Sequence, residues 1–308
     1  MAVLFAGFAA LLFGSSDFVG GYATRRNAAL LVVFLSQLSG LAAAAVAALV
    51  LGDPMARGED LFFGALAGLG GVLGLTLLYR GLATSVVAVV SPLAAVTGAV
   101  FPVLFGLAAG ERPALLAWLG IALALPAIVL LVWEPEEAEH HEDGEELVRG
   151  QIGPGMAPPH GAGKAAERRA VVLRGAVLGV AAGIGFGLSV IAISRVSAEA
   201  TLWPVAAARV AGMAALAPLL LLRRQGLRPA RGSVGIIILA GVLDMLGNIA
   251  FLEASRGTLL AIAAVVTSLY PAPTVLLGAV VFRERITRLR AAGLVLALGG
   301  IALISLPG

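Results

Sequence analysis

Cysteine is absent from the 308-residue sequence, lysine occurs once, and only 13% of the residues are charged. The absence of cysteine excludes disulfides, thioether-linked haem and thiolate metal sites. A soluble domain has roughly 25% charged residues, so this chain has too little polar surface to face water. The small basic excess, a formal net charge of +3, is spread thinly over short segments and does not indicate nucleic-acid binding.

Motifs of several enzyme classes are also missing. All three histidines lie in one polar segment, so the apolar parts contain no clustered His and acid groups for a membrane-embedded enzyme. We interpret His140 and His141, within an acidic run, as part of a solvated linker and not as a metal site. No GxxxxGK[ST] loop is present, because His160–Lys164 lacks its spacing and its following hydroxyl, which argues against an ATP-driven pump. We expect no cofactor and no metal.

Apolar runs dominate the rest of the chain, since 60% of the residues are hydrophobic. A hydrocarbon core about 30 Å thick is crossed by roughly 20 apolar helical residues. The sequence therefore predicts an all-α integral membrane protein with ten transmembrane helices. We expect the first run to be a retained helix, because no basic region precedes it. The expected spans are 3–22, 29–51, 60–80, 83–108, 114–133, 173–194, 201–222, 233–253, 258–282 and 288–306.

One long polar segment, 134–172, divides these spans five and five. It begins with eight carboxylates between Glu134 and Glu146, continues rich in glycine and proline, and ends with basic residues. This composition is typical of a flexible linker. The sequence predicts a first five-helix repeat at 1–133, a charged linker at 134–172 and a second five-helix repeat at 173–308.

The two halves align with each other at a shift of 173 positions. Identical aligned residues include Gly14 and Gly187, Gly68 and Gly241, Gly74 and Gly247, and Glu111-Arg112 and Glu284-Arg285. An internal repeat of this length indicates a repeated fold. Because five spans is an odd number, the second half is expected to enter the membrane from the opposite side. Such inverted repeats place a binding site between the halves near the midplane.

Each half ends with two apolar segments joined by a tight turn, Gly-Glu-Arg at 110–112 and Arg-Glu-Arg at 283–285. This repeated pattern resembles the EamA family of the drug/metabolite transporter superfamily, over nearly the whole chain except the linker. The resemblance implies a secondary transporter for small metabolites, amino acids or drug-like compounds, usually working outward. The family motifs do not specify the substrate. Abundant alanine, glycine and arginine indicate a bacterial genome rich in G and C.

The basic residues are distributed unevenly between the two sides of the membrane. Sixteen of the 21 fall in loops on the linker side and four on the other side. Cytoplasmic loops carry the excess of Lys and Arg. The count therefore predicts a multi-pass inner (plasma) membrane protein with a cytoplasmic linker and both termini outside, whereas the family is usually drawn with cytoplasmic termini.

Three ionisable residues lie inside expected spans: Asp17, Arg209 and Asp244. Each needs a partner or a wet cavity, because charge in the membrane is costly. Arg209 and Asp244 lie at a similar depth, roughly 12–14 Å, so they can pair. Asn248 is one turn from Asp244 on the same helix face. Two interpretations stay open. In the first, these residues serve transport, as a polar floor for the substrate or as a proton-linked carboxylate. In the second, they form a structural ion pair that fixes helix packing.

Asp17 lies in the first span, and Gln37 lies at similar depth in the second. Gln37 aligns with Arg209 within one position, so each half is expected to contribute one long polar side chain to the cavity. Asp17 is a candidate for proton exchange, and the alternative is a residue that stays wet near the interface. Val190 replaces Asp17 in the second half, which predicts a chemically asymmetric cavity.

Prolines interrupt the fourth and ninth spans, at positions 92, 102, 271 and 273. A proline removes one N–H donor and frees a carbonyl one turn earlier. We expect these helices to kink, with freed carbonyls available to line a cavity. Tyr270 is the expected substrate contact beside them. Glu111 and Glu284 are expected at the membrane edge, where they pair with adjacent arginines and cap the helix that follows.

The inverted repeats indicate alternating access, and the family resemblance implies a secondary active transporter that works by efflux, with proton coupling left open. The alternatives are a membrane-embedded lipid-modifying enzyme and a non-transporting membrane scaffold, and we expect no enzyme. Expected partners are a small-molecule substrate, the lipid bilayer and, if transport is coupled, protons; nucleic acid is not expected, and monomer and homodimer both stay open. The expected substrate-binding residues are Asp17, Gln37, Arg209, Asp244, Asn248 and Tyr270.

Overall fold

The computed structural model describes residues 1–85, 87–133, 162–222 and 228–306. Within these ranges the regular structure is entirely α-helical, and ten helical spans are long and apolar enough to cross a membrane. The predicted all-α membrane fold is therefore confirmed. His140, His141 and most of the predicted linker lie outside the described residues.

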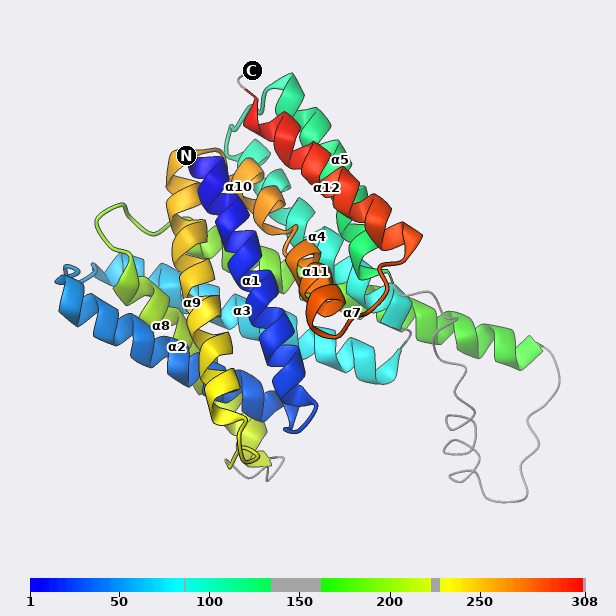
Figure 1. Ribbon diagram of the computed structural model, residues 1–308, viewed down its shortest axis with the longest axis horizontal. Helices are drawn as coiled ribbons and strands as arrows, with labels where there is room; N and C mark the ends of the chain where they lie inside the picture. The colour runs from blue at the N-terminus through cyan, green and yellow to red at the C-terminus, as the bar shows by residue number, and fades with distance from the viewer. Residues whose placement is uncertain (86, 134–161, 223–227, 307–308) are drawn as a thin grey trace.

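The helices keep the labels of Figure 1. The first half contains α1 (Ala2–Thr24), α2 (Ala29–Leu51), α3 (Gly58–Thr84), α4 (Val87–Ala108) and α5 (Leu115–Val132). The second half contains α7 (Ala162–Ile193), α8 (Leu202–Leu222), α9 (Val234–Gly257), α10 (Leu260–Thr267), α11 (Pro271–Val281) and α12 (Arg288–Ser305). Together α10 and α11 form one span, Leu260–Val281.

Two helices differ from the expected boundaries. The helix expected from 173 begins at Ala162, so the last part of the predicted linker, 162–172, is helical. Its alanines, arginines, lysine and glutamate are good helix formers, and the last proline of the linker, Pro159, lies before it. The ninth span is broken in two between Thr267 and Pro271, whereas α4 continues through both of its prolines.

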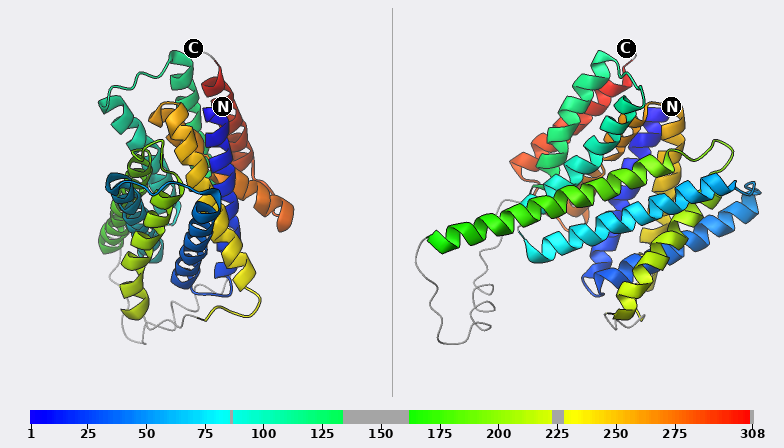
Figure 2. Two further views of the ribbon diagram at one scale, coloured as in Figure 1. Left: turned by 90° about the vertical axis from the view of Figure 1, so that its left-hand side faces the viewer. Right: turned by 180° about the vertical axis from the view of Figure 1, so that it is seen from behind.

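Helices of the two halves pack on each other in a pattern that recurs when the halves are exchanged. Helix α3 packs on α7 and α8, and the aligned helix α9 packs on α1 and α2. Helix α4 lies along α7, while α10 and α11 lie along α1. The view from behind shows α3 and α7 running side by side over most of their length (Figure 2). The halves are therefore interleaved.

Two aligned glycines allow the closest of these approaches. A Cβ atom on Gly68 of α3 would lie 2.0 Å from the carbonyl oxygen of Ala208 in α8, and one on Gly241 of α9 would lie 2.0 Å from the carbonyl oxygen of Ser36 in α2. No side chain fits such gaps, so only glycine permits these contacts. Each contact fixes the position of the backbone one residue before a polar side chain, which is Arg209 in α8 and Gln37 in α2.

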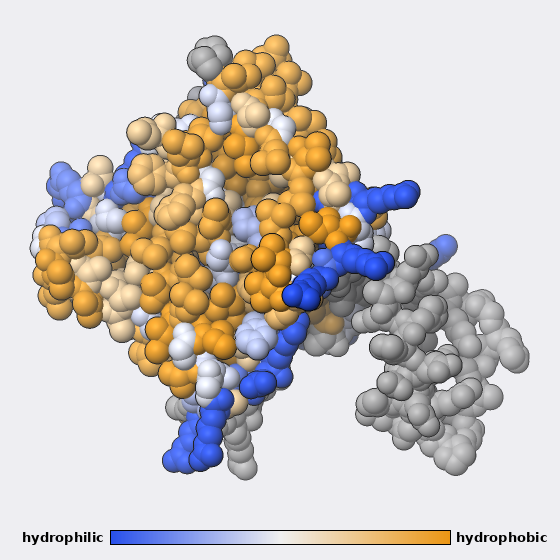
Figure 3. Space-filling model, in the orientation of Figure 1, coloured by the Kyte–Doolittle hydropathy of each residue, from blue (hydrophilic) through white to orange (hydrophobic). Residues whose placement is uncertain are grey.

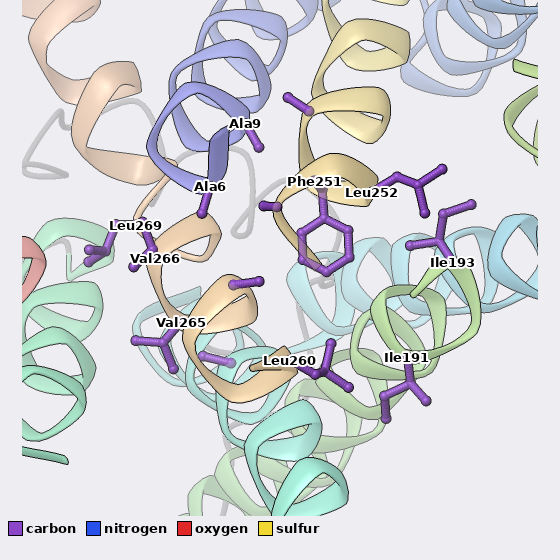
Figure 4. Packing of buried hydrophobic residues seen from close by; sticks show 14 of the residues in the cluster. Ala6, Ala9, Ile191, Ile193, Phe251, Leu252, Leu260, Val265, Val266 and Leu269 are labelled. Carbon is purple, nitrogen blue, oxygen red and sulfur yellow. The ribbon is translucent and has the colours of Figure 1, made fainter. Parts of the chain in front are cut away.

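Buried apolar side chains gather around α10, where Val265 and Val266 belong to the same hydrophobic cluster as Ala6 of α1 and Phe251 of α9 (Figure 4). The outer surface is also apolar, as the hydrophobic face in Figure 3 shows, with hydrophilic groups toward its edges. Leu49, Leu221 and Val280 are each more than 70% exposed. Exposed apolar surface on this scale indicates a membrane environment.

Candidate functional site

The centre of the polar site is Arg209 in α8, a residue only 5% exposed. Its Nη1 donates to Oε1 of Gln37 in α2 at 2.6 Å and to Oδ2 of Asp244 in α9. One guanidinium group therefore joins helices from both halves. Its Nε and Nη2 atoms are buried without a hydrogen-bond partner among the described residues, which makes the two bonds at Nη1 the more important for holding this charge.

Asp244 supplies the negative charge that balances Arg209. The predicted ion pair between these residues forms, and the Asp244 side chain remains 34% exposed while that of Arg209 is 6% exposed. Asp244 thus faces an accessible space from which Arg209 is hidden. The positive charge of Arg209 neutralises the negative charge of Asp244. Their attraction is strong because the surrounding interior has a low dielectric constant.

Asp17 of α1 lies near this pair but makes neither an ion pair nor a hydrogen bond with any described residue. It lies within electrostatic range of Asp244. Its side chain is exposed, although the neighbouring residue Ser16 is buried and donates to the carbonyl oxygen of Ala240 in α9 at 2.9 Å. One side of α1 is therefore fixed against α9, while Asp17 presents a free carboxylate beside it.

Tyr270 occupies the break between α10 and α11 and interacts electrostatically with Asp17. The break lies directly on α1, because a Cβ atom on Gly14 would be 2.3 Å from the carbonyl oxygen of Tyr270. Thr274 holds this contact, since its hydroxyl donates to the carbonyl oxygen of Gly14 at 2.9 Å. The broken helix thus places Tyr270 within electrostatic range of the free carboxylate.

The expectation of freed carbonyls at this break is wrong for the two that the prolines release. Pro271 cannot donate to Thr267, but the N–H of Tyr270 donates to that carbonyl at 3.1 Å. Pro273 cannot donate to Leu269, and the N–H of Ala272 donates there at 2.9 Å. Tight turns replace the missing α-helical bonds, so these carbonyls are not left open to a substrate.

The six predicted site residues come from four helices and one helix break. The structure joins Gln37, Arg209 and Asp244 by hydrogen bonds and places Asp17 and Tyr270 beside them. Asn248 is bound locally, because its Nδ2 donates to the backbone carbonyl of Asp244 at 2.8 Å and does not reach the carboxylate. The cluster combines one compensated carboxylate with one that has no counter-charge.

The described residues contain no group of three or more His, Cys, Asp or Glu side chains placed to hold a metal ion. The polar cluster itself combines two carboxylates, a guanidinium, two amides and a phenol. This set suits the binding of a polar solute by charge and hydrogen bonds.

Residues 173–306 match the model of the EamA-like transporter family. This segment, somewhat less than half of the chain, is similar to the EamA-like transporter family. The predicted resemblance is thereby confirmed over these residues, and the family is one of membrane transporters in the drug/metabolite transporter superfamily.

Comparison with solved structures supports the same architecture for the whole chain. A protein of known crystal structure superposes with a TM-score of 0.73 at 20% sequence identity, over 99% of this chain and 95% of the other. At this identity the likeness shows the fold alone. The comparison with curated protein sequences finds no match.

The Glu-Arg turn of the first half has a different partner from the one expected. Glu111 does not cap the helix that follows it; its two carboxylate oxygens accept the backbone N–H groups of Leu260 at 2.7 Å and Ala261 at 3.0 Å. These are free donors at the start of α10 in the second half, where a negative charge is favourable. The sequence could not reveal this, because it does not give the distance between residues 149 positions apart.

Glu284, the aligned residue of the second half, is exposed and makes no hydrogen bond or ion pair with a described residue. The two copies of the turn are therefore in different environments. Glu111 connects the halves at the end of the molecule that carries the termini, whereas Glu284 lies at the linker end without such a bond.

Further polar contacts join the halves at the termini end, and sequence analysis missed them. Asp60 of α3 is only 4% exposed and accepts the backbone N–H of Ser197 at 2.7 Å and its hydroxyl at 3.0 Å. Asp53 accepts the backbone N–H of Leu202 at 3.1 Å. Both aspartates looked like ordinary loop charges in sequence, because their partners are distant: Ser197 in the loop after α7 and Leu202 at the start of α8.

Proposed function

We propose that the chain is a secondary transporter whose substrate binds between the halves at Asp17, with Tyr270 and the Gln37–Arg209–Asp244 cluster around it. The observation that carries this proposal is the free, exposed carboxylate of Asp17 beside a compensated ion pair. A carboxylate without counter-charge inside a membrane span marks a pathway or binding site. The match of residues 173–306 to a transporter family supports transport, and the roles of the individual residues are our proposal.

The charge of the cluster suggests which solutes fit. Arg209 balances one of the two carboxylates, so the cluster carries one net negative charge when both are ionised. A small molecule with a protonated amino group, such as an amine or an amino acid, would supply the missing cation. Tyr270 adds an aromatic face and a hydroxyl. A proton is the alternative occupant of Asp17, which makes exchange of substrate for a proton, and hence efflux, the favoured mode.

Alternating access is the proposed mechanism, with the two halves as inverted repeats. The symmetry of the contacts between the halves supports it: α3 packs on α7 and α8 in the same way as the aligned helix α9 packs on α1 and α2. So does the difference between Glu111 and Glu284, since an end held by Glu111 is closed in this conformation. In the opposite conformation the bond from Glu111 to α10 would break. Binding in such folds takes place at the interface of the halves.

The deciding experiment is transport into proteoliposomes with radiolabelled amino acids and amines, each measured with and without a pH gradient. We expect the wild-type protein to move at least one compound with an amino group. Asp17→Asn is expected to lower its transport about tenfold or more, because the substrate cation loses its counter-charge. The matched control is Glu199→Gln, which removes a carboxylate whose side chain is 71% exposed at the surface.

Two results would contradict the proposal. One is that no amino compound moves under any gradient. The other is that Asp17→Asn transports as well as Glu199→Gln.

A further inference from the structure

A groove opens at the outside of the molecule where α3 and α7 approach the linker end. Its volume is about 530 Å³. The lining residues are Arg80 from α3 and Ala170, Leu173, Arg174, Val177 and Leu178 from α7. The groove therefore lies between one helix of each half, remote from the polar cluster described above.

The groove combines two exposed guanidinium groups with an apolar wall. Neither Arg80 nor Arg174 forms an ion pair with a described residue. From Arg169 to its end α7 contains no acidic residue, and the two acids of α3 lie at its opposite end. Beside them, Leu173 is 66% exposed and Val177 is 60% exposed. Among the side chains that the structure describes on these two helices, no acid lies near the two arginines.

The depth of the arginines narrows the class of ligand. Arg174 lies inside the span Arg169–Ser194, five residues from its start, or about 8 Å along the helix. A guanidinium at this depth extends toward the headgroup region and needs an anion there. A soluble anion would match the arginines but leave Leu173 and Val177 uncovered. A neutral lipid would match the wall but leave the arginines unpaired.

We propose that this groove binds one anionic phospholipid, with its phosphodiester between Arg80 and Arg174 and an acyl chain along Leu173 and Val177. Charge complementarity and the apolar wall select this ligand together. Because α3 and α7 belong to different halves, the bound lipid connects the halves at the linker end.

The test is native mass spectrometry of the full-length protein in detergent, titrated with phosphatidylglycerol or with phosphatidylcholine of the same acyl chains. We expect one tightly bound phosphatidylglycerol and weaker binding of phosphatidylcholine. The double variant Arg80→Gln/Arg174→Gln is expected to bind phosphatidylglycerol about thirty-fold more weakly, given the contribution of each basic residue near an anionic headgroup. Val177→Ser should weaken binding as well, although it leaves both arginines in place.

The matched control is Arg285→Gln/Arg288→Gln, which removes two exposed charges at the same end of the molecule but outside the groove. It should bind phosphatidylglycerol like the wild type. Equal loss in the control, unchanged binding in the groove variant, or equal affinity for the two lipids would overturn the proposal. Displacement of the lipid by millimolar inorganic phosphate would also overturn it, because the groove would then be a phosphate site.

Discussion

Arg209 donates to Gln37 at 2.6 Å across 172 sequence positions, and the two residues occupy aligned places in the two halves. The two halves therefore contact each other through side chains at aligned positions. The second half contributes a cation there, and the first half contributes a neutral amide. As a result Asp244 of the second half has a counter-charge, whereas Asp17 of the first half has none.

Removing Asp244 is expected to destabilise the protein more than removing Arg209. Asp244→Asn leaves a buried guanidinium with no counter-charge, at an expected cost of about 3–5 kcal/mol. Arg209→Gln leaves a carboxylate that is still 34% exposed, so its cost should be smaller, about 1–2 kcal/mol. Thermal unfolding in detergent, followed by tryptophan fluorescence, measures both.

A double replacement provides the control for this comparison. Arg209→Met/Asp244→Leu removes both charges together and should recover most of the stability lost in Asp244→Asn. An Arg209→Gln variant less stable than Asp244→Asn would contradict the assigned burial of the pair.

Alanine at the two close-approach glycines should disturb the site. Gly68→Ala and Gly241→Ala each place a methyl group 2.0 Å from a backbone oxygen of the facing helix, so the helices must separate. We expect each to lower stability by about 1–3 kcal/mol and to lower transport, because the Arg209–Gln37 bond depends on both contacts. Gly235→Ala is the control on the same helix as Gly241, since nothing lies within 4 Å of its added methyl group. A Gly235 variant as unstable as the other two would exclude this explanation.

The two Glu-Arg turns should differ in their tolerance of neutral replacement. Glu111→Gln keeps the side-chain length but removes the charge that accepts two N–H groups of α10, so we expect a loss of about 1–3 kcal/mol. Glu284→Gln alters an exposed group without such bonds and should change stability by less than about 0.5 kcal/mol. The same thermal assay compares them, and equal effects would argue against the assigned role of Glu111.

The membrane orientation can be measured directly, because the chain has no cysteine of its own. Met55 at the termini end and Ala28 at the linker end are both exposed. If the linker is cytoplasmic, as the basic residues predict, Met55→Cys should react with an impermeant maleimide in intact cells, and Ala28→Cys should react only after lysis. The reverse labelling pattern would show that both termini face the cytoplasm.

Much of the fold follows from local properties of the sequence. Long apolar runs separated by short polar turns predict ten spans, because each run must cross a fixed hydrocarbon thickness. The exceptions arise where local signals are ambiguous. Pro92 and Pro102 lie within a continuous α4, whereas Pro271 begins a new helix after a break that packs on Gly14 of α1. Packing partners of this kind are not encoded nearby in the sequence.

A contact in the candidate site could be predicted only where the depth of the two residues in the membrane was enough to bring them together. Arg209 and Asp244 lie at equal depth on adjacent helices, and the expected pair forms. Helical spacing placed Asn248 on the same face as Asp244, but its amide donates to the backbone carbonyl of Asp244 and not to the carboxylate. The partners of Glu111, Asp53 and Asp60 depend on how the halves are arranged in space, so residue type and local spacing could not identify them.

The bond from Glu111 to α10 also bears on how the protein is assembled. Residues 1–133 contain the acceptor, and residues 173–308 contain the free N–H groups that it satisfies. If the two segments were synthesised as separate polypeptides, each would expose interhelical surface that the other normally covers. Functional protein would then require both fragments to be produced together and to associate within the bilayer.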